Sequence, residues 1–364
     1  MKKATRYLLV LGLGALALAA APALAFHDGG VAHCNGCHTM HAGPSNPADN
    51  PNGNEFLLKE STPTDTCLRC HDDRLGNVFG GGDSDDPLNP GTLYGGGQFV
   101  FLLEDNINDG HNGASNPILG EKAGHSIISE DKGLAADSVN STAPGGTYLS
   151  SYLHCTSCHD PHGQGGHFRL LYGNDGNPNV DSTSQAAGYP YDFTAAPPDA
   201  VGIPVFGGGE SNSNHTAYNA GMSDWCATCH GDYHTGGGAS GFKHPTGEPL
   251  GSTIAANYNL YEGTGTYTGD GTDAYLAMVP FEDPTVTTDY VGAASGTSQV
   301  MCLTCHRAHA SSAPQAGRWD FNITIWDEEG VESGSYVIPN PYAATAGGHQ
   351  RSLCNKCHAK DPVL

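Results

Sequence analysis

The stretch that decides the fold is Leu153-His154-Cys155-Thr156-Ser157-Cys158-His159-Asp160-Pro161-His162. Two cysteines three positions apart, followed at once by a histidine, form the attachment signature of c-type haem. Each thiol adds across one vinyl group of the porphyrin, and the histidine that follows places its imidazole under the iron as proximal ligand. The spacing therefore predicts one covalently held haem at this stretch.

The same signature, called here an attachment phrase and numbered one to six in chain order, occurs six times. The phrases are Cys34/Cys37/His38, Cys67/Cys70/His71, Cys155/Cys158/His159, Cys226/Cys229/His230, Cys302/Cys305/His306 and Cys354/Cys357/His358. Together they use all 12 cysteines of the chain. We therefore predict six haem c groups, each with the histidine of its phrase as proximal metal ligand.

Two other kinds of protein use cysteines in pairs: an exported disulfide-rich protein and a zinc protein built on Cys-x-x-Cys knuckles. Disulfides give no reason for a histidine after every second cysteine. Zinc knuckles place their two pairs about 12 to 20 residues apart, whereas the shortest step between these pairs, from Cys34 to Cys67, is 33 residues. Haem attachment accounts for both the histidines and the spacing.

Residues 1–25 have the features of a secretory signal peptide. Basic residues precede the apolar run Leu8–Ala21, and Ala23-Leu24-Ala25 is a small-x-small cleavage site. A retained membrane anchor would need a longer apolar run, and no later stretch is long or apolar enough to span a membrane. We expect the signal to be removed and residues 26–364 to form a single hexahaem unit, exported through the periplasm to the cell surface or beyond.

The charge of the chain excludes several classes of partner. It has 15 basic and 38 acidic residues, for a formal net charge of −23. Nucleic-acid binding requires a basic surface, and anionic lipid attracts basic segments. The sequence therefore predicts no nucleic-acid partner and no tight binding to anionic membranes.

The composition also predicts an unusual fold. Only 38% of the residues are hydrophobic, and 51 Gly and 23 Pro interrupt any regular pattern. We predict a mostly irregular chain with few short helices and minor β-hairpins, organised around stacked haems that replace much of an apolar core. Single helical turns are expected at the phrases. Phe99–Leu103 is predicted to be a short buried strand, and Phe321–Trp326 to pair with Tyr336–Ile338 in a hairpin.

Histidines are predicted for the second axial position of each iron as well. The chain has 19 His but 5 Met, too few methionines for six irons. A histidine three residues after a proximal one, as in Cys-His-x-x-His, is tethered too tightly to reach its own iron and is expected to bind a neighbouring one. The chosen distal ligands are His41, His125, His162, His234, His244 and His309, with His154 in reserve. Six closed, low-spin irons pass electrons and leave no open site for a substrate.

Further words of sequence lie around the phrases. They include Cys37-His38-Thr39-Met40-His41, Ala143-Pro144-Gly145-Gly146-Thr147-Tyr148, Pro280-Phe281-Glu282, Cys305-His306-Arg307-Ala308-His309 and Leu353-Cys354-Asn355-Lys356-Cys357-His358. In these words, from one end of the mature chain to the other, the sequence resembles the extracellular filament-forming hexahaem cytochromes of metal-reducing bacteria, the OmcS type. The segments 42–66, 164–215 and 312–350 depart from that family in length and composition.

The resemblance implies an electron carrier rather than an enzyme, assembled head to tail into a filament with the haems stacked along it. It also implies that His41 ligates the haem of Cys302/Cys305/His306 in the neighbouring subunit. Besides the chain itself, the partners it implies are other multihaem cytochromes and extracellular metal oxides or partner cells. Two alternatives remain open: a monomeric periplasmic or surface electron shuttle, and a multihaem reductase with one open iron.

Overall fold

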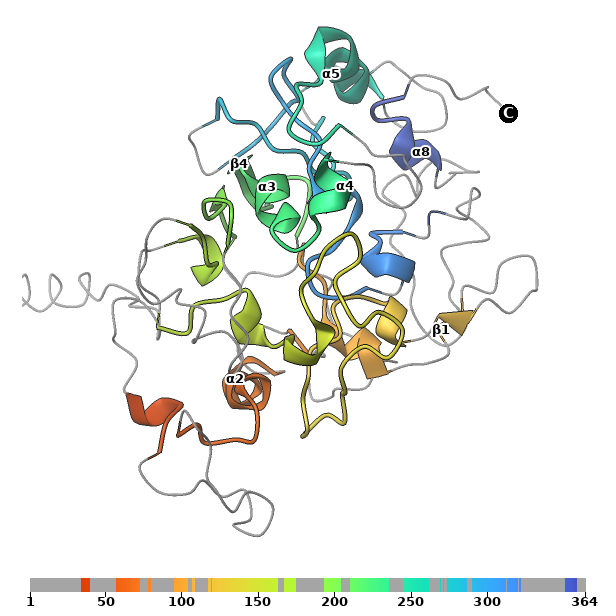
Figure 1. The fold of residues 1–364 in the computed structure, drawn as a ribbon. Coiled ribbons are helices and arrows are strands. Elements are labelled where there is room, and N and C mark those ends of the chain that lie inside the picture. Colours follow the sequence, from red (N-terminus) through yellow and green to blue (C-terminus); the bar gives the residue numbers. More distant parts are fainter. Residues whose placement is uncertain are drawn as a thin grey trace, which may run out of the picture.

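The attachment phrases lie on short helical turns joined by long irregular segments (Figure 1). The computed structural model describes residues 34–39, 57–72, 78–79, 95–103, 107–108, 117–118, 120–162, 167–174, 193–203, 210–235, 245–261, 269, 271, 274–286, 290–311, 313–319, 321 and 351–358. The predicted signal peptide lies outside these residues, and so do the predicted hairpin strands Phe321–Trp326 and Tyr336–Ile338 apart from Phe321. All helices and strands below refer to this part of the chain.

The helices are short. The α-helices are α2 (Pro63–His71), α3 (Met222–Ala227), α4 (Gly231–Thr235), α5 (Gly251–Leu260), α6 (Cys302–Cys305) and α8 (Arg351–Cys354). The 3-10 helices are η2 (Cys34–Gly36), η3 (Phe99–Leu103), η5 (Gly120–Lys122), η6 (Ser150–Tyr152), η7 (Cys155–Ser157), η8 (Phe168–Leu170) and η11 (Pro314–Ala316). The longest, α5, has ten residues, so the prediction of few short helices is confirmed.

The strands form two small antiparallel pairs. Strand β1 (Ile107–Asn108) pairs with β2 (Pro117–Ile118), and β3 (Asp199–Val201) pairs with β4 (Ala217–Ala220), with a bulge at Asn219 of β4. The strand predicted at Phe99–Leu103 is wrong, because this segment is the 3-10 helix η3. Its burial was predicted correctly. A short run of apolar residues buried on all sides has no periodicity that separates strand from helix.

Local sequence explains where α2 begins. The Thr62 side chain accepts a hydrogen bond from the Asp65 N–H at 3.0 Å, and Pro63 occupies the first helical position. Both are features of a helix N-terminus. The buried Asp65 carboxylate also accepts hydrogen bonds from the hydroxyl of Ser129 and the N–H of Glu130. It thereby ties the helix of phrase two to a loop more than 60 residues further along the chain.

Three buried apolar clusters pack against the attachment cysteines. One, around Phe99 and Phe101, contacts Cys155. Another, around Tyr218, contacts Cys226. The largest, around Tyr258, contacts Cys305 and Cys357. The apolar side chains are therefore gathered where the haems are expected, in agreement with a core that the cofactors complete.

Candidate haem-binding sites

Each phrase forms one helical turn. In five phrases the N–H of the histidine donates to the carbonyl of the first cysteine, and in phrase two all three residues lie within α2. The N···O distances are 2.8 Å at His38, 3.1 Å at His159 and His230, and 3.0 Å at His306 and His358. Residues three and four positions apart share one face of such a turn. Both thiols and the imidazole of a phrase therefore lie on the same side, as attachment of one haem requires.

All 12 cysteines are free thiols, so every pair is available for thioether bonds. Here each thiol stands in for the thioether sulfur of the mature protein. Cys67 of phrase two and Cys155 of phrase three share a hydrogen bond, and so do Cys226 of phrase four and Cys302 of phrase five. These two contacts place the second phrase against the third and the fourth against the fifth.

Electrostatic coupling between thiols connects the remaining neighbours. Burial and the Cys70 thiol raise the pKa of Cys37, which places phrase one beside phrase two. Burial and the Cys229 thiol likewise raise the pKa of Cys158, which joins phrases three and four. Burial and the thiol of Cys354, in phrase six, raise the pKa of Cys305 in phrase five to about 12. The six phrases therefore follow one another in space in the order of the chain.

Three proximal histidines are held by the backbone through Nδ1. His159 Nδ1 lies 2.7 Å from the Arg169 carbonyl oxygen, and His230 Nδ1 lies 2.7 Å from that of Pro144. His306 Nδ1 lies 2.9 Å from the carbonyl oxygen of Gln315. Because a carbonyl only accepts, Nδ1 carries the proton and Nε2 is left with its lone pair. This tautomer is the one that binds a metal through Nε2.

In phrases one, three and four the proximal histidine lies opposite a second histidine. The ring centroids of His38 and His162 are 6.4 Å apart with the rings nearly parallel, and those of His159 and His309 are 6.4 Å apart. His125 and His230 are 5.9 Å apart. With metal–nitrogen bonds of about 2 Å, two imidazoles on opposite sides of one metal ion have centroids about 6 Å apart. The residues present therefore fit six-coordinate haem iron at these three phrases.

Backbone hydrogen bonds between neighbouring segments position both His125 and His309. The His125 N–H donates to the His309 carbonyl at 2.9 Å, and the His309 N–H donates to the Gly96 carbonyl at 2.7 Å. Their Nδ1 atoms lie 2.7 Å and 3.3 Å from the carbonyl oxygens of Ala308 and Gly97. Because the backbones of the two histidines are hydrogen-bonded to each other, the second ligands expected at phrases three and four are fixed relative to each other.

The protein atoms around the two imidazoles favour their neutral form, although His125 is exposed at the surface and His309 is half-buried. Desolvation, with a smaller contribution from His230, lowers the pKa of His125 to about 4. Desolvation, with a smaller contribution from His159, lowers the pKa of His309 to about 3. A metal binds the neutral ring, so these residues need no deprotonation at physiological pH.

The other predicted distal ligands are placed less closely. His154 Nδ1 lies 3.2 Å from the Thr64 hydroxyl of α2, and burial lowers its pKa. His234 Nε2 lies 2.9 Å from a carboxylate oxygen of Asp224. His41 and His244 lie outside the described residues. The structure therefore brings His125, His162 and His309 to a proximal histidine.

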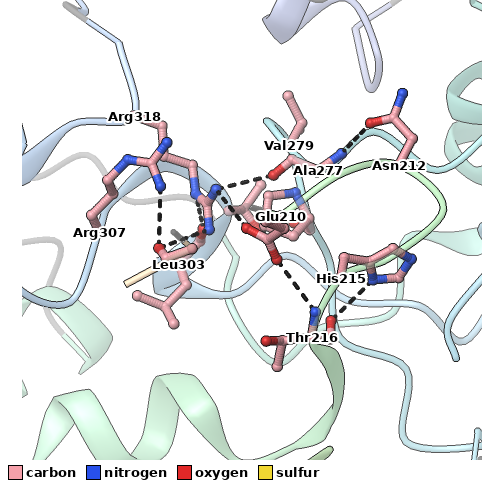
Figure 2. A network of polar contacts seen from close by, with 12 residues as sticks. Glu210, Asn212, His215, Thr216, Ala277, Val279, Leu303, Arg307 and Arg318 are labelled. Atoms are coloured by element: carbon pink, nitrogen blue, oxygen red, sulfur yellow. Dashed lines mark hydrogen bonds and ion pairs between the residues drawn. The ribbon is translucent and has the colours of Figure 1, made fainter. Parts of the chain in front are cut away.

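A buried charge network next to phrase five was not predicted from the sequence. Figure 2 shows Arg307, Arg318 and Glu210 gathered in it. Arg318 donates to the carbonyls of Leu303 and Ala277 at 2.6 Å and 3.0 Å, and its guanidinium lies 4.0 Å from the Glu210 carboxylate. Burial, together with Arg318, lowers the pKa of Arg307 to about 9.

These three side chains together carry one excess positive charge in a buried place. Charges of one sign are costly away from water unless an opposite charge is near. Haem carries two propionates, which suit paired guanidinium groups. The available clue in the sequence was position alone, since Arg307 directly follows the proximal His306 and the chain has only 15 basic residues.

Glu282 is a buried carboxyl group between phrases four and five. It is 2% exposed, and its carboxylate accepts a hydrogen bond from the N–H of Met222, the first residue of the helix that carries Cys226, at 3.2 Å. Burial raises its pKa to about 7, the Met222 N–H opposes the rise, and Asp224 adds to it. Glu282 thus titrates near neutral pH.

We expect Glu282→Gln to stabilise the protein at alkaline pH. The pKa of Glu in the unfolded state is 4.5, so between pH 4.5 and about 7 only the folded state keeps this carboxyl group protonated. The free energy of unfolding of the wild type therefore falls as the pH rises through this range. The variant should match the wild type near about pH 4 and exceed it by about 3 kcal/mol near about pH 8. Urea unfolding at both pH values measures the gap. A gap that does not change with pH would contradict the expectation.

Six attachment turns, paired imidazoles and a largely irregular chain define a multihaem c-type cytochrome. No family model matches the chain. It is 33% identical over 446 aligned residues to the C-type cytochrome OmcS of Geobacter sulfurreducens, covering 99% of this chain and all of that protein. The chain belongs to the OmcS family of c-type cytochromes.

Solved structures give the same result. The chain matches a structure of the Outer Membrane Cytochrome S filament from Geobacter sulfurreducens with a TM-score of 0.69 and 31% identity, over 92% of this chain and all of that one. A structure of the OmcS nanowires of the same organism matches with a TM-score of 0.68 and 31% identity over the same shares. The predicted fold class is confirmed.

Proposed function

We propose that this protein is a hexahaem electron carrier and the subunit of an extracellular cytochrome filament. The observation that carries the proposal is the set of three histidine pairs, each facing across about 6 Å beside two free thiols. Haem c supplies an iron that alternates between the ferric and ferrous states. The chain contributes the sulfur attachment, both axial imidazoles and the apolar surroundings.

From these pairs we infer the second ligands at three phrases. His162 serves the iron of His38, His309 that of His159, and His125 that of His230. His162 and His309 each stand three residues after a proximal histidine, so one Cys-His-x-x-His peptide holds two irons. This arrangement links phrase three to phrase one and phrase five to phrase three.

The irons of phrases two, five and six take their second ligands from the other chosen histidines. These are His41, His154, His234 and His244. We assign His41 to phrase five of the neighbouring subunit. A head-to-tail contact of this kind is heterologous and builds an open filament. One coordination bond across the joint would fix the spacing where the path of electrons passes between subunits.

The order of the phrases supports transport along the molecule. Because consecutive phrases are in contact or electrostatically coupled, six haems attached to them would form one continuous row. The relatives with solved structures are described as a filament and as nanowires. We therefore place this chain outside the cell, where it would pass electrons to metal oxides, other multihaem cytochromes or partner cells. Among the described residues, no helix is long and apolar enough to cross a membrane.

The decisive experiment compares the wild type with His41→Ala. The purified wild type is expected to contain six haems per chain by pyridine haemochrome assay, to be entirely low-spin, and to form filaments under the electron microscope. His41→Ala is expected to remain a monomer with one high-spin haem. If His41→Ala forms filaments with six low-spin irons, the assignment of His41 as the cross-subunit ligand is wrong. A wild type that stays monomeric would favour the electron shuttle.

A further inference from the structure

Phrase six contains a buried charge that the other five phrases lack. The residue just before the second cysteine is, in chain order, Gly36, Arg69, Ser157, Thr228, Thr304 and Lys356. Arg69 forms an ion pair with Glu60 and its side chain is 44% exposed. Lys356 is 3% exposed. Of the six positions, Lys356 alone therefore combines a formal charge with burial.

The contacts of Lys356 are those of an ammonium ion. Its Nζ donates to the carbonyl oxygens of Tyr258, Ala274 and Tyr261 at 2.7, 2.9 and 3.3 Å. An ammonium group has three protons to donate, whereas a neutral amine has two. Nζ also lies 4.2 Å from the centre of the Tyr258 ring, a position that favours a cation.

The cation is fixed at the C-terminus of α5, which lies next to α8 in Figure 1. The last carbonyls of a helix have no partner within it and carry partial negative charge. Lys356 binds one of these, that of Tyr258, together with the carbonyl of Tyr261, the residue that directly follows the helix. In return, the Asn257 side chain donates to the carbonyls of Asn355 and Lys356 at 2.9 Å and 3.1 Å. Helix and phrase therefore hold each other in one register.

We propose that Lys356 sets the reduction potential of the sixth haem, raising it above the value that a neutral side chain would give. The inference rests on the proposed function, because it needs a haem at Cys354 and Cys357. Oxidation adds a positive charge to the iron, and a fixed cation nearby opposes this step.

The surroundings of Lys356 strengthen this effect. Tyr258 and Leu353 belong to the largest apolar cluster, and Cys357 packs against it. Coulomb interactions are several-fold stronger in such surroundings than in water. Lys356 also directly precedes Cys357, one of the two attachment cysteines of this phrase.

A higher potential at phrase six has a consequence for transport. This phrase stands at one end of the row, next to phrase five. An electron on the subunit would occupy the haem of phrase six in preference to a neighbouring haem of lower potential. In a head-to-tail filament the resting site would recur once in every subunit, beside the joint.

The test is a spectroelectrochemical titration of the assembled protein with Lys356→Met. We expect one of the six one-electron steps to move to lower potential, with at least a tenfold change in its ratio of oxidised to reduced haem, which corresponds to about 59 mV. Lys356→Arg should restore the wild-type curve. Arg69→Gln, the matched change at the exposed position of phrase two, should leave the curve unchanged.

The outcomes separate the inference from the proposed function. Six haems in Lys356→Met with an unshifted titration would overturn the role of Lys356 and leave the electron carrier intact. Fewer than six haems in the wild type would overturn the carrier itself. If Lys356→Met does not mature, Lys356→Gln, which keeps a donor for the carbonyls, must show the same downward shift.

Discussion

Replacing His309 with alanine is expected to turn one of the six low-spin haems into a high-spin haem. His309 faces His159 with ring centroids 6.4 Å apart, and the proposed iron between them would lose its second axial ligand. The ferric protein should then show a high-spin electron paramagnetic resonance signal that amounts to one haem per chain. Since phrase three lies inside the row, conduction along the filament should fall as well.

The change should also weaken the fold. His309 is stacked on Phe99 with ring centroids 4.4 Å apart, within the apolar cluster that contacts Cys155. Removing this half-buried ring leaves a cavity beside Phe99, at a cost of about 2 kcal/mol. The spin state separates loss of the ligand from loss of packing, because a cavity alone leaves the iron six-coordinate.

Two variants serve as controls for His309→Ala. His309→Met supplies a thioether that also binds haem iron, so it should stay low-spin and raise the potential of that haem. His167→Ala removes a histidine whose Nδ1 likewise lies 3.1 Å from a carbonyl, that of Leu171, and should leave all six irons low-spin. A fully low-spin His309→Ala would show that His309 is not a ligand.

The attachment sites can be predicted from the sequence because their chemistry is local. Two thiols and an imidazole within five residues define a haem site without any knowledge of the fold, and the structure forms a helical turn at every one. The tether argument for Cys-His-x-x-His was local too. It led to His162 and His309, which the structure places opposite His38 and His159.

Features that depend on distant contacts could not be predicted in this way. Gly124 and Ala310 meet only because the chain folds back over more than 180 residues, and this contact is what aligns His125 with His309. The buried network of Glu210 and Arg318 likewise joins separate segments. The run Phe99–Leu103 gave burial but not conformation, since a continuous apolar run lacks a period.

The turn 143–146 provides the second large expected effect, through Gly146→Ala. A Cβ added at Gly146 would lie 1.7 Å from the carbonyl oxygen and 2.8 Å from the carbonyl carbon of Cys229. Both are backbone atoms, so neither moves aside as the end of a side chain would. The same turn holds phrase four from two sides, because the Pro144 carbonyl binds His230 Nδ1 at 2.7 Å and the Gly145 carbonyl accepts the Asp232 N–H at 2.8 Å.

Relief of the overlap must therefore separate the turn from phrase four and release His230 from Pro144. We expect Gly146→Ala to lose about 3 kcal/mol of stability or more. It should mature with five low-spin haems, and the haem of phrase four should be high-spin or missing. Gly231→Ala is the matched control, since Gly231 follows His230 directly and its added Cβ meets nothing within 4 Å. That variant should keep six low-spin haems, because alanine also favours the first turn of α4. Equal stability and equal spectra for the two variants would mean that the turn does not hold the proximal histidine. A defect confined to Gly146→Ala would show that the ligand geometry of phrase four depends on glycine, which has no side chain, at position 146.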